Sequence, residues 1–130
     1  GLPSLTAADY ARVTAYDLDR NWLRCEGRTV ASSESLTHAA VYEGPARISA
    51  VIHCHSGALW EQLLALGPIT SATVEYGTPA MAREVQRLFR ETDVRQQQIF
   101  AMAGHENGVV AFGRTAAEAM VILRQRAGRI

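Results

Sequence analysis

Short runs of apolar, often β-branched residues alternate along this chain with segments that have the spacing and caps of helices. An apolar run of four to eight residues bounded by turn residues is typical of a buried strand. Residues 48–53, 99–102 and 109–112 are such runs. Because strands interleaved with helices pack as a sheet covered by helices, this order predicts one α/β domain with a sheet sandwiched between helix layers.

Capping residues mark the expected helices. One follows the hydroxyl groups of Ser32 and Ser33, has its apolar positions between residues 36 and 41, and ends at Gly44-Pro45. A second is expected over residues 58–66. The last two begin at Thr78-Pro79, a cap followed by proline at the first helical position, and at the capping box Thr115-x-x-Glu118.

The N-terminal part of the chain predicts a hairpin. Residues 11–19 alternate apolar and polar side chains, Asp19-Arg20-Asn21 is typical of a tight turn, and residues 22–25 form the returning strand. Ahead of the hairpin, residues 5–9 predict a short helical turn capped by Ser4.

The charged residues exclude several classes of function. Thirteen basic residues balance thirteen acidic ones, so we expect no nucleic-acid partner and no acidic-membrane partner. Every basic residue is an arginine, and the chain contains no lysine. This excludes Schiff-base enzymes, pyridoxal-phosphate enzymes and P-loop nucleotide hydrolases, because each of them uses a lysine amine.

The cysteine content indicates a reducing compartment. Cys25 and Cys54 are too few for a disulfide framework and do not form C-x-x-C, so we expect a cytoplasmic protein. No apolar run approaches the ~18 residues of a membrane helix, and no signal segment opens the chain. Since residue 1 is glycine, the chain is expected to be trimmed or a fragment. A domain of this size folds without a structural metal, so any metal is expected to serve chemistry.

Three of the four histidines lie where they can bind a metal ion. His53 and His55 are two residues apart at the end of a predicted strand, so both point to one face, and Cys54 points to the opposite, core side. His105 lies in a glycine-bracketed turn between two strands. Three histidines with an open fourth position describe a catalytic zinc site. Taken alone, H-x-H also occurs by chance, and a histidine near the end of a strand is often just hydrogen-bonded to the backbone.

Several of these segments together resemble the class II aldolase and adducin family, in the same order and at similar spacing. They are Ser32-Ser33-Glu34, the helix from His38 to Tyr42, the strand ending in His53-Cys54-His55-Ser56, and Gly104-His105 with the strand that begins at Gly108. The resemblance covers the chain from about Asp17 to the last helix. It implies a three-layer sandwich with a central, mainly antiparallel sheet between helix layers.

The resemblance also implies roles for six residues. Zinc or another divalent metal would be bound by His53, His55 and His105. The catalytic acid/base would be Glu34, and the substrate phosphate would be held by Ser32 and Ser33. Glu34 and the two serines also have a simpler interpretation. An acid in the first helical turn is favoured by the helix dipole, and serines are common helix caps. We interpret His38 as a structural or partner-facing residue.

The function implied is a zinc-dependent, fuculose-phosphate-aldolase-like carbon–carbon lyase. Its substrate would be a small hydroxy-ketone or sugar, with or without a phosphate group, cleaved through a zinc-stabilised enediolate. The metal would then do what a lysine imine does in other aldolases, consistent with the missing lysine. A non-catalytic, adducin-like binding module and a sugar-phosphate dehydratase or epimerase on the same site are the alternatives.

The resemblance raises two expectations about completeness and assembly. Residues 1–130 form a single domain that lacks the family's usual N-terminal section with its phosphate loop, so the chain is a fragment or its phosphate pocket is built differently. Family members are commonly homotetramers, so a homo-oligomer is expected. Trp60, Leu63 and Leu64 are candidates either to contact a neighbouring subunit or to be buried in the chain's own core.

Overall fold

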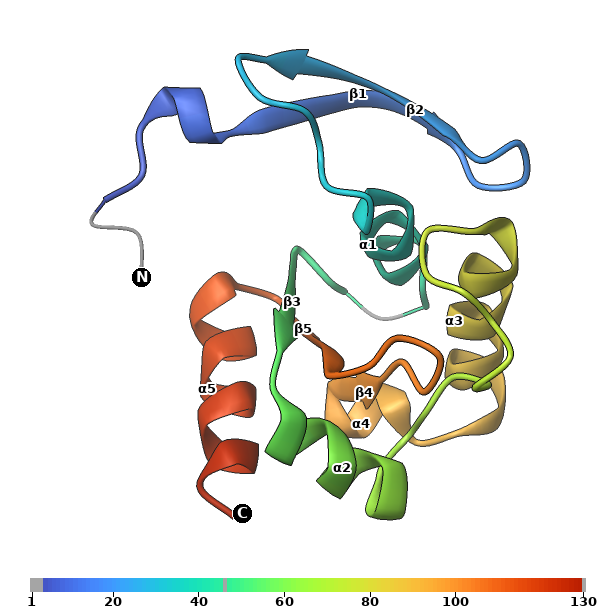
Figure 1. Cartoon of the computed structure of the whole chain (residues 1–130). Helices are drawn as coiled ribbons and strands as arrows, with labels where there is room; N and C mark the ends of the chain where they lie inside the picture. Colours follow the sequence, from blue (N-terminus) through green and yellow to red (C-terminus); the bar gives the residue numbers. More distant parts are fainter. Residues whose placement is uncertain (1–3, 46, 130) are drawn as a thin grey trace.

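The computed structural model describes residues 4–45 and 47–129 (Figure 1). Helices and strands interleave along the chain, which confirms the α/β class. The elements are η1 (Ala7–Asp9), β1 (Ala11–Asp17), β2 (Trp22–Gly27), α1 (Ser35–Tyr42), β3 (Ala50–His55), α2 (Gly57–Leu66), α3 (Pro79–Glu91), α4 (Val94–Gln97), β4 (Ile99–Ala101), β5 (Gly108–Gly113) and α5 (Ala116–Ala127).

The central sheet has the order β3-β5-β4, and both of its strand pairs are antiparallel. In β3 and β5, Ala50 pairs with Gly113 at one end and His55 pairs with Gly108 at the other. This register brings the second histidine of H-x-H directly opposite the residue at which β5 begins.

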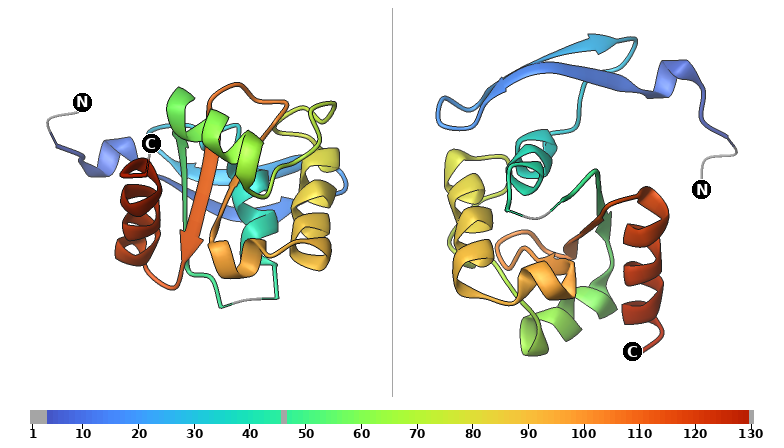
Figure 2. Two further views of the ribbon diagram at one scale, coloured as in Figure 1. Left: turned by 90° about the horizontal axis from the view of Figure 1, so that it is seen from below. Right: turned by 180° about the vertical axis from the view of Figure 1, so that it is seen from behind.

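Helices cover both faces of this sheet, as the expected sandwich requires (Figure 2). Along β5, Val110 and Phe112 pack into one cluster with α1 and α3, whereas Val109 and Ala111 pack into a second cluster with α2 and α5. Successive strand residues point to opposite faces, so an unbroken apolar strand is what a sheet buried on both sides needs. All six residues of β5 are buried.

The predicted hairpin forms, but it pairs only with itself. β1 and β2 make a separate two-stranded antiparallel sheet that crosses over α1, on the side away from the central sheet (Figure 1). Its turn includes Asn21, which has a positive φ of 57°. A cavity of about 780 Å³ lies between β1 and α1 and is lined in part by Tyr16, His38 and Tyr42.

Several boundaries differ from the sequence expectations. The short turn at the N-terminus is capped by Thr6 and not by Ser4, because Thr6 and Asp9 form a reciprocal capping box. The strand expected over residues 48–53 lies at 50–55, so it includes His55. α4 was not predicted, because four residues are too few to show helical periodicity.

No helix in the described ranges combines the length and the apolar character needed to span a membrane.

Candidate metal centre

Two histidines lie on one face at the end of β3. His53 and His55 alternate with Cys54, which packs partly buried against the cluster formed with α2 and α5. This is the alternation that period-2 geometry predicts for a strand. Burial raises the pKa of the Cys54 thiol, as expected for a cysteine on the core side. The imidazoles of His53 and His55 have ring centroids 5.0 Å apart.

The third histidine comes from the turn before β5. The backbone N–H of His105 donates to the Met102 carbonyl at 3.0 Å, and the N–H of Gly108 donates to the His105 carbonyl at 2.9 Å. Asn107 completes the turn with a φ of 66°. The indole N–H of Trp60 in α2 donates to the same Met102 carbonyl at 2.9 Å, which anchors the start of the turn.

The three imidazoles converge. One ring nitrogen of each residue lies within 4.8 Å of the other two. Nε2 of His105 is 3.2 Å from Nε2 of His55. Three ligands at zinc–nitrogen distances of about 2.0–2.1 Å in a tetrahedron would be about 3.3 Å apart, so this pair already has the required separation. The ring of His53 would have to move only slightly towards the other two for all three nitrogens to bind one ion.

The environment of His53 keeps its imidazole neutral. Burial, the largest cause, and the neighbouring charges of His55, His105 and His38 together lower the pKa of His53 to about 4. Its Nε2 atom is buried and has no hydrogen-bond partner among the described residues. A buried nitrogen lone pair without a partner is unfavourable. A neutral imidazole is the form that binds a metal ion, so this donor set fits a divalent cation that accepts nitrogen ligands.

Tyr76 also belongs to this centre, and sequence reasoning missed it. Its ring centroid lies 4.2 Å from that of His105. The next residue, Gly77, has a φ of 69°, and a Cβ there would lie 3.1 Å from the Ser33 carbonyl oxygen. The segment around Tyr76 therefore joins the histidine turn to the Ser32-Ser33 segment. A glycine following an aromatic residue was the only hint in the sequence.

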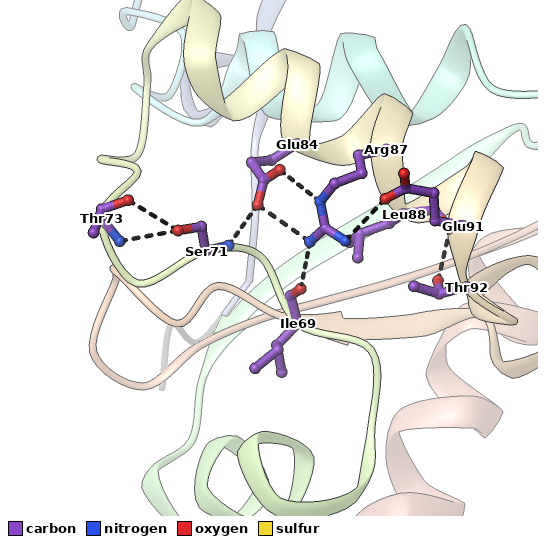
Figure 3. A network of polar contacts seen from close by, with 8 residues as sticks. All are labelled: Ile69, Ser71, Thr73, Glu84, Arg87, Leu88, Glu91 and Thr92. Carbon is purple, nitrogen blue, oxygen red and sulfur yellow. Dashed lines mark hydrogen bonds and ion pairs between the residues drawn. The ribbon is translucent and has the colours of Figure 1, made fainter.

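The loop that carries Tyr76 is fixed at both sides. Gly104 approaches it so closely that a Cβ on Gly104 would lie 2.5 Å from the Val74 carbonyl oxygen. On the other side, Glu84 of α3 accepts hydrogen bonds from the backbone N–H of Ser71 at 2.6 Å and from Nε of Arg87 at 2.7 Å (Figure 3). Arg87 also donates to the Ile69 carbonyl at 3.2 Å. These contacts hold the loop between α3 and the histidine turn.

The expected phosphate-binding serines lie beside this loop. Ser32 and Ser33 line a cavity of about 500 Å³ together with Tyr76 and, from the hairpin, Trp22. Both serines are exposed, and Oγ of Ser32 accepts a hydrogen bond from the backbone N–H of Glu34 at 3.1 Å. The cavity therefore reaches from the start of α1 to the aromatic ring that contacts His105.

Glu34 precedes α1 at its N-cap position, but its side chain makes no capping hydrogen bond. The residue is 3% exposed, and neither carboxylate oxygen has a hydrogen-bond partner among the described residues. A buried carboxylate without a partner is costly, so the simple capping interpretation does not account for it. None of the hydrogen bonds among the described residues joins it to the three histidines.

The remaining candidates take structural positions. His38 lies in α1, and burial lowers its pKa. Leu63 is fully buried, whereas Trp60 is partly buried and packs against the same cluster as Leu63. Both therefore contribute to the chain's own core. Leu64 is partly exposed.

A comparison with protein families gives one match. A family model described as "Class II Aldolase and Adducin N-terminal domain" matches residues 2–125. No curated protein and no solved structure matches the chain. The match covers nearly all of the 130 residues, including the three histidines, Glu34 and the two serines.

Proposed function

Because the chain belongs to the class II aldolase and adducin family, we propose that its three histidines hold a catalytic divalent cation, most simply zinc. The observation that carries this proposal is the convergence of His53, His55 and His105 from a strand and a turn. Three neutral nitrogen ligands leave coordination positions for a substrate, which distinguishes a catalytic site from a closed structural one.

We propose that the reaction is the cleavage of a carbon–carbon bond in a small hydroxy-ketone or sugar, with or without a phosphate group. When bound, the cation supplies a positive charge that polarises the carbonyl of such a substrate and stabilises the negative charge formed during cleavage. The absence of lysine supports this assignment, because the imine route to the same stabilisation needs a lysine amine.

Glu34 is the residue we propose as the proton carrier. Glu34 would take the proton that the substrate hydroxyl loses as the carbon–carbon bond breaks, and would then give it to the carbon next to the carbonyl, where the negative charge has formed. Its burial without a partner supports this role, since the energetic cost of such a carboxylate is more easily explained by catalysis than by stability.

Ser32, Ser33 and Tyr76 would position the substrate. The serine hydroxyls and the free backbone N–H groups at the start of α1 suit the oxygens of a phosphate or sugar. The ring of Tyr76 packs against the ring of His105 and would limit the access of water to the reacting carbonyl of a bound substrate.

The test is product analysis with a panel of ketose phosphates and free ketoses on the metal-loaded protein. We expect an aldehyde and a smaller ketone as products. Glu34→Gln should lower turnover by roughly 10²–10⁴-fold, the usual contribution of a positioned acid/base, while metal stays bound. Glu61→Gln, at an exposed position in α2, is the matched control and should retain full turnover.

Other outcomes would replace this proposal. Metal-loaded protein that binds these sugars without converting any of them would favour an adducin-like binding module. Loss of water or inversion at one carbon would favour a dehydratase or an epimerase. Unchanged turnover in Glu34→Gln would reduce Glu34 to a structural residue.

A further inference from the structure

A second cleft lies at the end of the central sheet opposite the histidines. Its volume is about 330 Å³, and its walls come from the segment before β3, the end of β5, and residues in and next to α4 and α5. Its lining includes Arg47, Arg95, Gln98, Gly113, Arg114 and Glu118. In the left view of Figure 2, the β5 arrow runs from the loops at the histidine end down to this end of the sheet.

Three arginines and one acid line the cleft, which gives it an excess of positive charge. Arg47, Arg95 and Arg114 are all exposed. Among the described residues, no ion pair joins any of the three to an acidic side chain, and their guanidinium groups make no hydrogen bond within the protein. The donors of three guanidinium groups are therefore available to a ligand.

The floor of the cleft is a fixed polar network. Gln98 has a φ of 60°, an uncommon conformation for a residue other than glycine. Its side-chain amide donates to the Phe112 carbonyl at 3.1 Å and to Oε1 of Glu118 at 2.8 Å. Residues held in sparsely populated backbone conformations concentrate at functional sites.

The one acid in the cleft already has hydrogen-bond partners. Besides the bond from Gln98, Oε2 of Glu118 accepts from the backbone N–H of Arg114 at 3.1 Å. The Glu118 side chain folds over Gly113 so closely that a Cβ there would lie 3.0 Å from Cγ of Glu118. Hydrogen bonds from Gln98 and from the Arg114 backbone thus hold the Glu118 carboxylate in place, whereas the arginine side chains of the cleft make no such bonds among the described residues.

The cleft and the histidines are too far apart to bind the same group of one small substrate. Gly113 and Gly108 are the two ends of β5, which corresponds to roughly 17 Å at about 3.4 Å per residue. His55 pairs with Gly108, so the histidine centre lies at the far end of this strand. A ligand in the arginine cleft would be a second ligand.

We propose that this cleft is a binding site for a phosphate group of a small molecule, separate from the histidine centre. Guanidinium groups bind phosphate through pairs of parallel hydrogen bonds, and several arginines are suited to the two or more negative charges of a phosphate or pyrophosphate. Glu118 orients the floor through Gln98 and the Arg114 backbone, which leaves the three arginine heads for the ligand.

Nuclear magnetic resonance titration of the ¹⁵N-labelled, metal-loaded protein tests the proposal. Inorganic phosphate, pyrophosphate and malonate are the three probes. We expect saturable shifts of the Gln98, Gly113 and Arg114 amides with phosphate and stronger binding of pyrophosphate. Shifts confined to His55 and His105 would mean that phosphate binds the metal, and would overturn the proposal. Malonate binding as tight as that of pyrophosphate would overturn the preference for phosphate.

Two double variants that lose the same charge distinguish binding in the cleft from general electrostatic attraction of the anion to the protein. The double variant Arg95→Gln/Arg114→Gln should weaken pyrophosphate binding by at least about tenfold, because it removes two guanidinium groups that can donate charge-assisted hydrogen bonds. Arg12→Gln/Arg83→Gln removes the same charge from exposed positions outside the cleft and should leave binding unchanged. Equal weakening in both variants would contradict the proposal. Arg95→Lys keeps the charge but loses the paired donors, and should bind less tightly than the wild type.

Discussion

The ring of His105 lies over the backbone of Gly108. A Cβ on Gly108 would collide with this ring and would lie 3.0 Å from the His105 carbonyl oxygen. Because Gly108 is paired with His55 across β3 and β5, the missing side chain opens the space through which the third imidazole reaches the other two. The glycine is therefore a structural condition for the histidine cluster.

Gly108→Ala is expected to disrupt that convergence. The added methyl group must push the His105 ring away from His55, so zinc affinity should fall by about 10–100-fold, the range typical of changes to groups that orient metal ligands. Competition with a chromophoric chelator measures the zinc affinity. Gly128→Ala is the control, because Gly128 has an ordinary helical φ of −68°. Equal affinity in Gly108→Ala and wild type would show that the close approach is unimportant.

Tyr76→Ala is expected to loosen the cover over His105. An aromatic pair contributes about 0.5–1.5 kcal/mol, so zinc affinity should fall by roughly two- to tenfold. Tyr76→Phe retains the ring and should bind zinc as the wild type does. The same chelator competition distinguishes them, and equal losses in the two variants would point to the hydroxyl group instead of the ring.

Glu84→Gln is expected to destabilise the loop that carries Tyr76. The carboxylate accepts hydrogen bonds from Ser71 and Arg87, so the free energy of unfolding at pH 7 should fall by about 1–2 kcal/mol in urea denaturation. Glu91→Gln is the control. Its carboxylate is 3.5 Å from Arg87 and its side chain is 59% exposed, so the change should stay within about 0.5 kcal/mol.

The Glu84 effect should also depend on pH. The hydrogen bond from Arg87 holds the pKa of Glu84 below its ordinary value of 4.5. A carboxylate with a lowered pKa in the folded state stabilises the protein above its ordinary pKa and loses that contribution as the pH falls through the lowered value. The difference between wild type and Glu84→Gln should therefore be complete at pH 7 and shrink below about pH 4.5. A difference that grew on acidification would contradict this account.

Assembly is expected to cover the hairpin. Exposed apolar and aromatic side chains gather on and beside it, among them Tyr10, Val13, Tyr16 and Trp22. A two-stranded sheet of this kind is only marginally stable without further packing. Light scattering at micromolar concentration should give a mass several times 14.2 kDa, and four times 14.2 kDa if the expected homotetramer forms. A monomer over the whole concentration range would contradict the expectation.

The parts of the histidine centre that follow from local rules could be predicted from sequence. Period-2 geometry places His53 and His55 on one face, and the glycines around His105 indicate a turn that can approach them. The sandwich followed in the same way from buried strands alternating with capped helices. Each of these inferences depends on neighbours along the chain.

The parts that depend on distant contacts could not be predicted. Tyr76 reaches His105 only because its loop is held by Glu84 of α3 and by the backbone next to Gly104. The burial of Glu34 is likewise set by tertiary packing, whereas its sequence position suggested only a helix cap. The packing of Trp60 against the core, with its indole bonded to Met102, was one of two open alternatives.

Metal content tests the central claim most directly. Elemental analysis of the purified wild type should find about one zinc or other divalent ion per chain, and His53→Ala/His55→Ala should contain almost none. His38→Gln removes a histidine of α1 outside the cluster and should keep its metal. Wild-type protein that takes up no metal after incubation with zinc, or a double variant that retains full occupancy, would contradict the assignment of the histidine centre.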